Sequence, residues 1–325
     1  MKKVLFFVFL MLAYSVFAEN EVHKELKNAP QKKGKGGFTS SFLAASNFIF
    51  NDSRSVIGQK DGSNVTLGLS LKGGFNYLKK LNELQFNMEI SQQFSRTPDL
   101  ERFVKSSDIA KFDLSYLYNI SKIWGPFVKV SLDTSLLPGY NETKDDEDYI
   151  IPDGPDVTTN SMKLVSSLQP MIFKQTAGLY YRPIKKKSIT FQLNAGAGAM
   201  EVLADGGYAL NDDDATDAIE LLALKSYSEL GSSIFMKLNG TVKSASIVDY
   251  DLRLELMTPF LNDDDQNRGV FELTNINFSF TVSSKVTSWL SVNYELKITK
   301  TPQLLDEFQI QNNIMLSLNY MLIGK

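Results

Sequence analysis

The side chains that could act on a solute are charged residues placed at every second position of otherwise apolar segments. In the segment 248–256, Asp249, Asp251, Arg253 and Glu255 alternate with apolar residues. A period of two places all four on one face of an extended strand. The same pattern selects this set of candidate residues: Lys72, Glu89, Lys111, Asp113, Lys129, Asp133, Lys174, Asp249, Asp251, Arg253, Glu255, Glu295 and Lys297.

Charges of both signs on the inner faces of strands can do one of two things. They can line a water-filled pore and set its selectivity, or they can pair with one another into a closed polar core. The first alternative predicts a passive or gated channel for small polar solutes. The second predicts a non-conducting surface barrel whose acidic loops bind a partner or lipopolysaccharide.

The residue inventory argues against catalysis. His23 is the only histidine and lies in a polar segment near the N-terminus, whereas a serine hydrolase of the Ser-His-Asp type needs a histidine base. No Gly-x-Ser-x-Gly motif and no P-loop occurs, and there is no cysteine for a thiolate site. We therefore expect neither an enzyme nor a bound cofactor. The glycines and alanines at 195–199 are expected to let strands approach closely or to leave room in a lumen.

Three acidic clusters suggest a calcium site, because hard cations take several oxygen ligands. None has the spacing or the glycine of an EF-hand loop, so solvated loop tips are the favoured interpretation. A third alternative is that divalent cations bridge these loops to lipopolysaccharide phosphates. The candidate ligands are Asp145, Asp146 and Asp148, then Asp212, Asp213 and Asp214, and then Asp263, Asp264 and Asp265.

The elements that position these side chains are long alternating strands. They exceed the usual strand length in globular proteins and suit a tilted membrane crossing. We predict an all-β, antiparallel, up-and-down transmembrane barrel of about 12 strands. The predicted strands are 38–50, 64–77, 83–95, 108–120, 124–137, 166–182, 188–203, 218–238, 245–259, 270–284, 287–299 and 307–322. Of these, 218–238 is the least regular, since 215–224 also fits a short helix.

The connections and the aromatic residues indicate an orientation. Long connections, among them 138–165 and 204–217, alternate with short basic turns such as Lys185 to Lys187. Outer-membrane barrels have long loops outside and short turns in the periplasm. The long segment from Tyr140 to Lys163 is a candidate lid or constriction. Tyr and Trp prefer the membrane interface, and several of them fall at the short-turn ends: Tyr77, Tyr118, Trp124, Tyr181, Trp289 and Tyr320.

The N-terminal segment predicts export. Lys2 and Lys3 precede an apolar run, and Val16-Phe17-Ala18 resembles a cleavage site, so 1–18 is predicted to be a signal peptide. Residues 19–37 are predicted to form a flexible periplasmic leader, and 38–325 the barrel. The net charge of -3 does not favour a nucleic-acid partner. Mean hydropathy is -0.14, too low for a helical membrane protein.

From Phe38 to Leu322 the chain resembles bacterial outer-membrane β-barrel proteins, most of all barrel families without an assigned function. The resemblance implies a location in the outer membrane, contact with its lipid and lipopolysaccharide, and help from the barrel-assembly machinery during insertion. Such barrels commonly end on an aromatic residue. Here the chain continues past Tyr320 to Lys325, so Tyr320 is the expected assembly signal. Neither the resemblance nor the sequence fixes an oligomeric state.

Overall fold

The computed structural model describes most of the chain from Gly37 to Gly324. The described residues are 37–53, 62–97, 100, 102–152, 154–186, 188–211, 216–243, 247–264, 266, 268–287 and 289–324. The predicted signal peptide, almost all of the predicted leader, and His23 lie outside this set.

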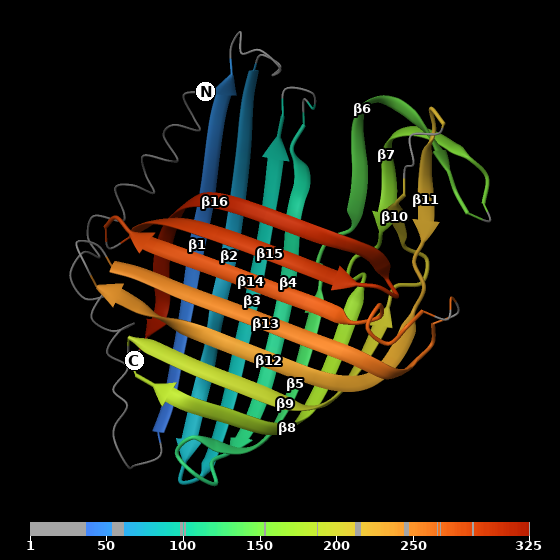
Figure 1. Ribbon diagram of the computed structural model, residues 1–325. Coiled ribbons are helices and arrows are strands. Elements are labelled where there is room, and N and C mark those ends of the chain that lie inside the picture. The colour runs from blue at the N-terminus through green and yellow to red at the C-terminus, as the bar shows by residue number, and fades with distance from the viewer. Residues whose placement is uncertain are drawn as a thin grey trace.

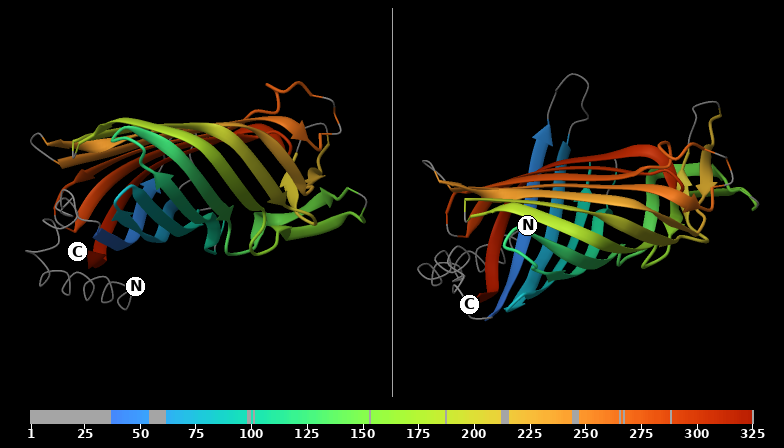
Figure 2. Two further views of the ribbon diagram at one scale, coloured as in Figure 1. Left: turned by 90° about the horizontal axis from the view of Figure 1, so that it is seen from below. Right: turned by 60° about the horizontal axis from the view of Figure 1, so that its bottom comes forward.

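Within the described residues, twelve antiparallel strands close into one barrel (Figure 1). This confirms the predicted fold class. In chain order these strands are β1 (Gly37–Ser53), β2 (Gly62–Lys79), β3 (Asn82–Arg96), β4 (Val104–Tyr118), β5 (Trp124–Thr134), β8 (Met171–Lys185), β9 (Ile189–Leu203), β12 (Tyr227–Lys243), β13 (Ile247–Asn262), β14 (Asn275–Lys285), β15 (Leu290–Thr301) and β16 (Leu305–Gly324). The strands β1–β5 form one wall, and the others cross it at a steep angle as a second wall (Figure 2).

Four further strands form a separate small sheet on the long-loop side. They are β6 (Gly139–Ile150), β7 (Val157–Val165), β10 (Tyr208–Leu210) and β11 (Ile219–Ala223), in the spatial order β10-β11-β6-β7. The sheet has its own small core of Tyr149, Met162 and Leu221. In Figure 1 it projects beyond the ends of the barrel strands.

This small sheet corrects two sequence predictions. The segment 218–238 is not one strand: β11 ends at Ala223, and β12 begins a new element at Tyr227. The chain changes sheets there because Leu221 packs in the small core while β12 pairs with β9 and β13. The segment 138–165, expected as a loop, is a β-hairpin because β6 pairs with β7.

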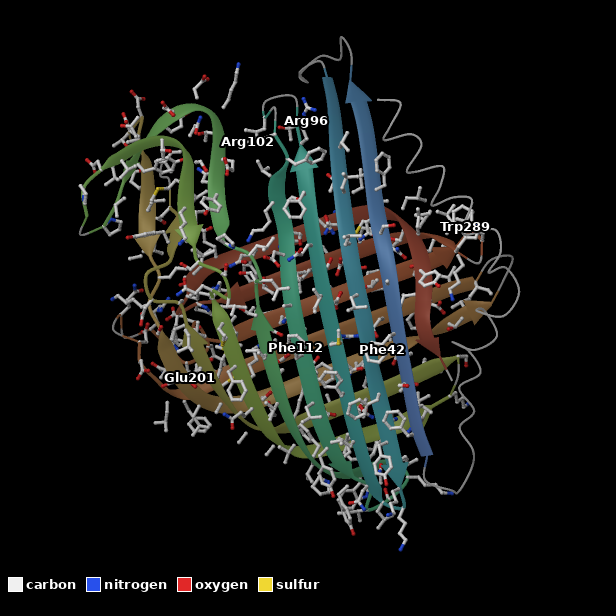
Figure 3. The ribbon with its side chains drawn as sticks, turned by 180° about the vertical axis from the view of Figure 1, so that it is seen from behind. Phe42, Arg96, Arg102, Phe112, Glu201 and Trp289 are labelled. Carbon is white, nitrogen blue, oxygen red and sulfur yellow. The ribbon has the colours of Figure 1, made fainter. Side chains whose placement is uncertain are left out.

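The alternation separates two chemically different faces of the barrel. On β2, Leu67 and Leu69 are exposed on the outside, and Leu69 is 71% exposed. Phe42 and Phe112 project from the same outer face (Figure 3). An exposed apolar band on a closed barrel belongs in hydrocarbon, because every backbone group within paired strands is already hydrogen-bonded.

Aromatic residues mark the short-turn end of this band. The exposed members are Tyr77, Tyr116, Tyr118, Trp124, Tyr181 and Tyr320. Trp289 is less exposed and lies in the turn before β15, where its carbonyl accepts a hydrogen bond from the Asn319 N–H (Figure 3). Rings at this level suit the membrane interface. The short-turn end is called the periplasmic end below.

Glycine allows a tight approach between β8 and β9. Gly178 and Gly196 are paired in register on the lumen face. A Cβ added to either residue would lie 2.1 Å from a carbonyl oxygen of the neighbouring strand. This is the close strand approach expected from the small residues at 195–199.

Candidate functional site: the charged lumen

The lumen contains one cavity of about 680 Å³ that extends along most of the barrel. At the periplasmic end its lining includes Glu83, Arg182 and Lys185, and at the opposite end Asp108 and Pro170. A water molecule occupies about 30 Å³ in the liquid, so the cavity has room for roughly twenty waters. This size suits a small molecule rather than a folded polypeptide.

The structure places nearly all of the predicted charged residues around this cavity. Those that line it are Lys72, Glu89, Lys111, Asp113, Lys129, Asp133, Asp251, Arg253, Glu255, Glu295 and Lys297. Lys174 and Asp249 do not line it, but both are paired on the lumen side of the wall. Lys174 Nζ lies 3.5 Å from Glu255 Oε1, and Asp249 Oδ2 lies 3.4 Å from Lys285 Nζ.

On the wall formed by β2–β5 the charges form a row of alternating sign. Lys72 pairs in register with Glu89, Glu89 with Lys111, and Lys111 with Asp133. The Lys72 Nζ to Glu89 Oε1 distance is 2.5 Å, and Lys111 Nζ lies 3.3 Å from Asp133 Oδ2. Opposite charges on directly facing residues stabilise strand pairing, so this row also fixes the register of four strands.

The opposite wall carries a second group of charges. One side chain of the β1–β5 wall, Lys129, reaches across to it. Arg253 Nε donates to Asp251 Oδ1 at 2.6 Å, and Lys237 Nζ lies 3.8 Å from Asp251 Oδ2. Lys129 on β5 extends over the Phe235 ring of β12, with its Nζ 4.9 Å from the ring centroid. This contact joins the two walls at the middle of the lumen and narrows it.

The cavity lining is balanced in charge. It includes eight basic side chains, which are Lys72, Lys111, Lys129, Arg182, Lys185, Lys237, Arg253 and Lys297. It also includes eight acidic side chains, which are Glu83, Glu89, Asp108, Asp113, Asp133, Asp251, Glu255 and Glu295. With equal numbers of both signs, the lining repels neither cations nor anions as a class.

Sequence reasoning missed five charged residues of the lining, which are Glu83, Asp108, Arg182, Lys185 and Lys237. Lys237 lies between Phe235 and Asn239 on the lumen face of β12. The sequence did not show which face it occupies, because the alternation over 218–238 is interrupted where the chain changes sheet. Glu83 shares its face with Gln85 and Glu89, so extending the alternation to the start of β3 would have found it. Arg182 stands at the end of an alternating run that includes Tyr180.

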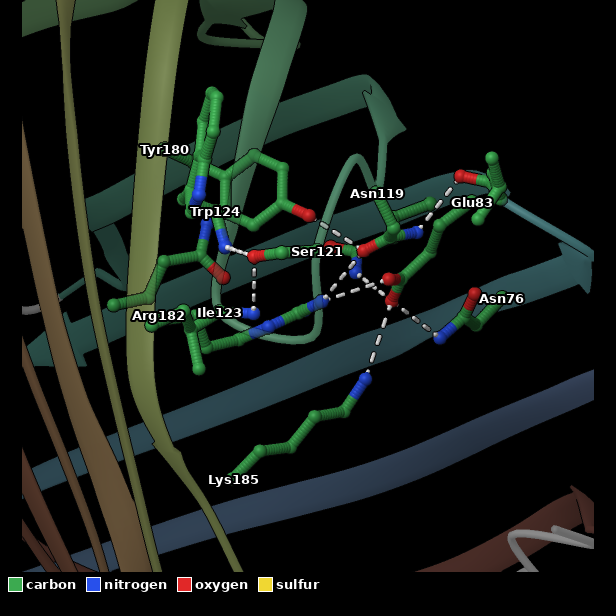
Figure 4. Close-up of polar contacts among 12 residues, drawn as sticks. Asn76, Glu83, Asn119, Ser121, Ile123, Trp124, Tyr180, Arg182 and Lys185 are labelled. Carbon is green, nitrogen blue, oxygen red and sulfur yellow. Dashed lines mark hydrogen bonds and ion pairs between the residues drawn. The ribbon is translucent and has the colours of Figure 1, made fainter.

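A buried polar cluster, named here the Glu83–Arg182 lock, lies at the periplasmic end of the cavity (Figure 4). Arg182 Nη2 donates to Glu83 Oε2 at 2.9 Å, and these residues are 5% and 1% exposed. The other Glu83 oxygen accepts from Gln85 at 2.7 Å and from Asn76 at 3.3 Å, and Lys185 Nζ lies 3.7 Å away. A carboxylate and a guanidinium buried this deeply hold each other in place.

Asn119 connects the lock to the neighbouring turn. Its Oδ1 accepts from Arg182 Nη2 at 3.3 Å and from the Tyr180 hydroxyl at 2.5 Å. Its Nδ2 donates to the Leu81 carbonyl at 3.0 Å. The side chains of Tyr180, Leu117 and Phe127 pack together beside it. Two short turns and three strands therefore meet at one ion pair.

The opposite end of the lumen is filled on one side by apolar residues. The cluster comprises Met200, Val202, Ala204, Leu224, Tyr227 and Met257, with Val165, Ile172, Ala209 and Leu304 packed against it. We name this set the mouth cluster. It joins β9, β12 and β13 to the small sheet through Val165 and Ala209. The lumen cavity runs beside the mouth cluster, along the side lined by Asp108, Ser135, Pro170 and Gln309.

The segment from Tyr140 to Lys163, expected as a candidate lid, does not line this cavity. It is tied instead to the loop after β3. Arg102 Nη2 donates to a Glu142 carboxylate oxygen, and also to the Asn160 carbonyl at 3.2 Å. The hairpin β6–β7 therefore extends outward from the barrel mouth.

The acidic candidates for a metal are engaged locally or spread apart. Within the described residues, no group of three or more acidic or histidine side chains converges on one point. Asp263 accepts from Ser228 N at 3.0 Å, and Asp148 accepts from the Thr158 hydroxyl at 2.5 Å. Asp145 and Asp146 are exposed on β6. Asp212, Asp213, Asp214 and Asp265 lie outside the described residues.

Asp264 forms an ion pair instead of a metal site. Its Oδ1 lies 2.6 Å from Arg268 Nη2, and its Oδ2 accepts from the Arg268 backbone N–H at 2.9 Å. These hydrogen bonds from Arg268 lower the pKa of Asp264, and they raise the pKa of Arg268 in return. Arg268 also lies 3.1 Å from Asp306 Oδ2, which joins this loop to the start of β16.

Solved structures of bacterial outer-membrane proteins are similar to this chain. The β domain of the Bordetella autotransporter BrkA is 8% identical and covers 88% of this chain and 99% of its own, with a TM-score of 0.37. An outer-membrane channel from Pseudomonas putida F1 is 12% identical over 90% and 97%, with a TM-score of 0.38. The translocator domain of NalP from Neisseria meningitidis is 7% identical over 89% and 90%, with a TM-score of 0.34.

No protein-family model and no curated protein matches the chain. Among the described residues, no helix is long and apolar enough to cross a membrane. Three features are those of a barrel that spans a membrane: the closed sheet, the exposed apolar band and the aromatic residues at its short-turn end. The chain folds as a closed antiparallel β-barrel of the membrane-spanning kind.

Proposed function

We propose that the barrel is a gated channel for small polar solutes. The observation that supports this most directly is a lumen cavity with balanced charge, whose lining extends from the Glu83–Arg182 lock to Asp108 and Pro170. Water and a small solute fit the volume. The lock lies across the periplasmic end, so its opening is the gating step.

The charge balance narrows the class of solute. Eight basic and eight acidic side chains give no net attraction for either sign, so neutral or zwitterionic molecules are favoured over ions of one sign. Both partners of each ion pair remain available to exchange hydrogen bonds with a passing solute. No step in this proposal is catalytic, and none requires a cofactor or a metal.

Liposome swelling tests the proposal. Proteoliposomes are shrunk in a sugar or amino-acid solution, and the rate of re-swelling reports entry of the solute. A neutral sugar and a zwitterionic amino acid should enter faster than a singly charged ion of the same size. If vesicles with folded barrel take up these solutes no faster than empty vesicles, the channel proposal is refuted.

A second candidate function is a non-conducting surface barrel. The contact between Lys129 and the Phe235 ring across the lumen favours it, as does the ion pair between Lys174 and Glu255. In that case the outward-projecting β6–β7 hairpin, with Asp145 and Asp146 exposed, is the surface that contacts a partner or lipopolysaccharide. Calorimetry with purified lipopolysaccharide, with and without Ca²⁺, tests this alternative. Absence of binding under both conditions would eliminate lipopolysaccharide as the ligand of this surface.

A further inference from the structure

The barrel is closed by a seam that is paired over only part of its length. β1 pairs with β16 from Ser41 to Phe48, opposite Leu316–Gly324. Toward the long-loop end, β1 continues to Ser53 paired with β2, and β16 extends back to Leu305 paired with β15. The described residues show no pairing between 49–53 and 305–315. We name this gap in the wall the notch.

The lower limit of the notch is set by polar side chains inside the barrel. Ser317 Oγ lies 2.6 Å from Asn47 Oδ1, and Asn293 Nδ2 donates to Ser317 Oγ at 2.6 Å. These hydrogen bonds hold β1, β15 and β16 together one residue before the last paired position, which is Phe48 with Leu316. Beyond it, β16 turns away from β1 and runs beside β15 (Figure 1).

Another seam with short pairing is sealed, which makes the notch distinctive. β4 pairs with β5 only from Ala110 to Leu117. Above this, the two Asp108 carboxylate oxygens accept from the backbone N–H groups of Leu136 and Leu137 at 3.1 and 2.7 Å. Lys105 Nζ donates to the Leu137 carbonyl at 2.9 Å. The edge of β4 is therefore covered by the chain that leaves β5.

The β16 side of the notch is apolar outside, apart from the exposed Asn312, and polar inside. Phe308, Ile310 and Ile314 are 57%, 64% and 68% exposed and continue the membrane-facing band. Between them in sequence lie Gln309, Gln311 and Asn313, whose positions alternate with that outer face. Gln309 lines the lumen cavity. Across this one strand the surroundings change from bilayer to charged lumen.

An unpaired strand edge is costly in hydrocarbon, because its N–H and C=O groups find no partner there. We propose that the notch is a lateral doorway for an amphiphile of the membrane. Its acyl chain lies against Phe308, Ile310 and Ile314, and its polar head occupies the gap, pairs with the free strand edges and reaches Gln309. We infer a lipid as the occupant because the exposed apolar band of the barrel continues up to the edge of the notch. The doorway does not depend on whether the long axis of the barrel conducts.

Tryptophan fluorescence in vesicles of brominated phosphatidylcholine tests this proposal, because bromine on an acyl chain quenches only indole rings that it reaches. The chain has two tryptophans, Trp124 and Trp289, and both are first replaced by phenylalanine. Gln311→Trp then places the probe on the lumen side of the notch. Ile314→Trp is the lipid-facing control, and Gln192→Trp is the control on the far lumen wall.

The proposal predicts that quenching of Gln311→Trp approaches that of Ile314→Trp, while Gln192→Trp is not quenched. A Gln311→Trp variant as protected as Gln192→Trp would overturn it. Quenching of Gln192→Trp to the same extent would also overturn it, since lipid would then fill the whole lumen. Each variant is first checked for heat-modifiable gel mobility, and Asn313→Trp replaces Gln311→Trp if the latter does not fold.

Discussion

The two ends of the lumen are lined by residues of different chemistry. At the periplasmic end, the Glu83–Arg182 lock is a buried ion pair with amide and ammonium partners, and among the described residues Arg182 Nε has no hydrogen-bond partner. At the opposite end, the mouth cluster is apolar and joins the barrel to the small sheet. A charged lock can exchange partners with water and reopen, whereas apolar packing is lost only when the packed elements separate. In the proposed gated channel, this difference puts the gate at the periplasmic end and the rigid element at the other.

The largest expected effect is on Arg182→Ala. Removing the guanidinium leaves the Glu83 carboxylate buried with weaker partners, which should lower the free energy of unfolding by about 3–5 kcal/mol. Equilibrium urea unfolding in liposomes measures it. The double variant Glu83→Gln/Arg182→Gln removes both charges and should be less destabilised than Arg182→Ala. If Arg182→Ala unfolds at the wild-type urea concentration, the lock contributes nothing to stability.

A smaller loss of stability is expected for Met257→Ala in the mouth cluster. Met257 is 5% exposed, and truncation of a buried methionine costs about 2–4 kcal/mol through lost burial and a residual cavity. Solute flux should not increase, because the cavity passes beside the cluster. Leu230→Ala on the outer face is the matched control. A large rise in solute flux through Met257→Ala would mean that the mouth cluster, rather than the Glu83–Arg182 lock, is the gate.

A change of charge in the middle of the lumen should alter ion selectivity without lowering the stability of either end of the barrel. Arg253→Glu changes the balance of the lining by two charges, so the reversal potential in a salt gradient should shift toward that of a cation-selective pore. Lys144→Glu makes the same charge change on an exposed position of β6 and should leave the reversal potential in place. An equal shift in both variants would show that surface potential, not the lining, sets selectivity.

The smallest effect concerns pH at the loop that holds Asp264. Its pKa is lowered by the hydrogen bonds from Arg268, so the ion pair contributes stability above the ordinary aspartate pKa of about 3.9. That contribution is lost as the pH falls through the lowered pKa of the folded state. Hydrogen exchange of 263–274 should therefore accelerate only in strong acid, and Asp264→Asn should exchange faster already at neutral pH. Identical exchange in the two proteins would contradict this.

The sequence predicted the barrel because alternation is a local property that each strand carries by itself. The row from Lys72 to Asp133 was assigned to the lumen face for the same reason. The small sheet was missed because β6 is rich in polar residues on both faces and β11 is only five residues long. Its core forms only when Tyr149 and Leu221 meet from distant segments.

The lock and the notch lay beyond sequence reasoning for a different reason. Glu83 and Arg182 are 99 residues apart, and their pairing depends on which strands lie near each other around the barrel. The notch depends on how far two strands at opposite ends of the chain remain in register. The alternation of residues shows which face of its strand each residue occupies. It shows neither how far two strands stay paired nor which side chains of distant strands meet inside the barrel.

Conductance across a planar bilayer tests the central claim most directly, namely that the lumen is a channel closed by the Glu83–Arg182 lock. The wild-type barrel should give small current steps with little preference between cations and anions, and Arg182→Ala should give larger or more frequent steps. Folding of both proteins is confirmed by heat-modifiable gel mobility. If neither folded protein conducts above the background of the bare bilayer, the barrel is a closed scaffold and the account is wrong.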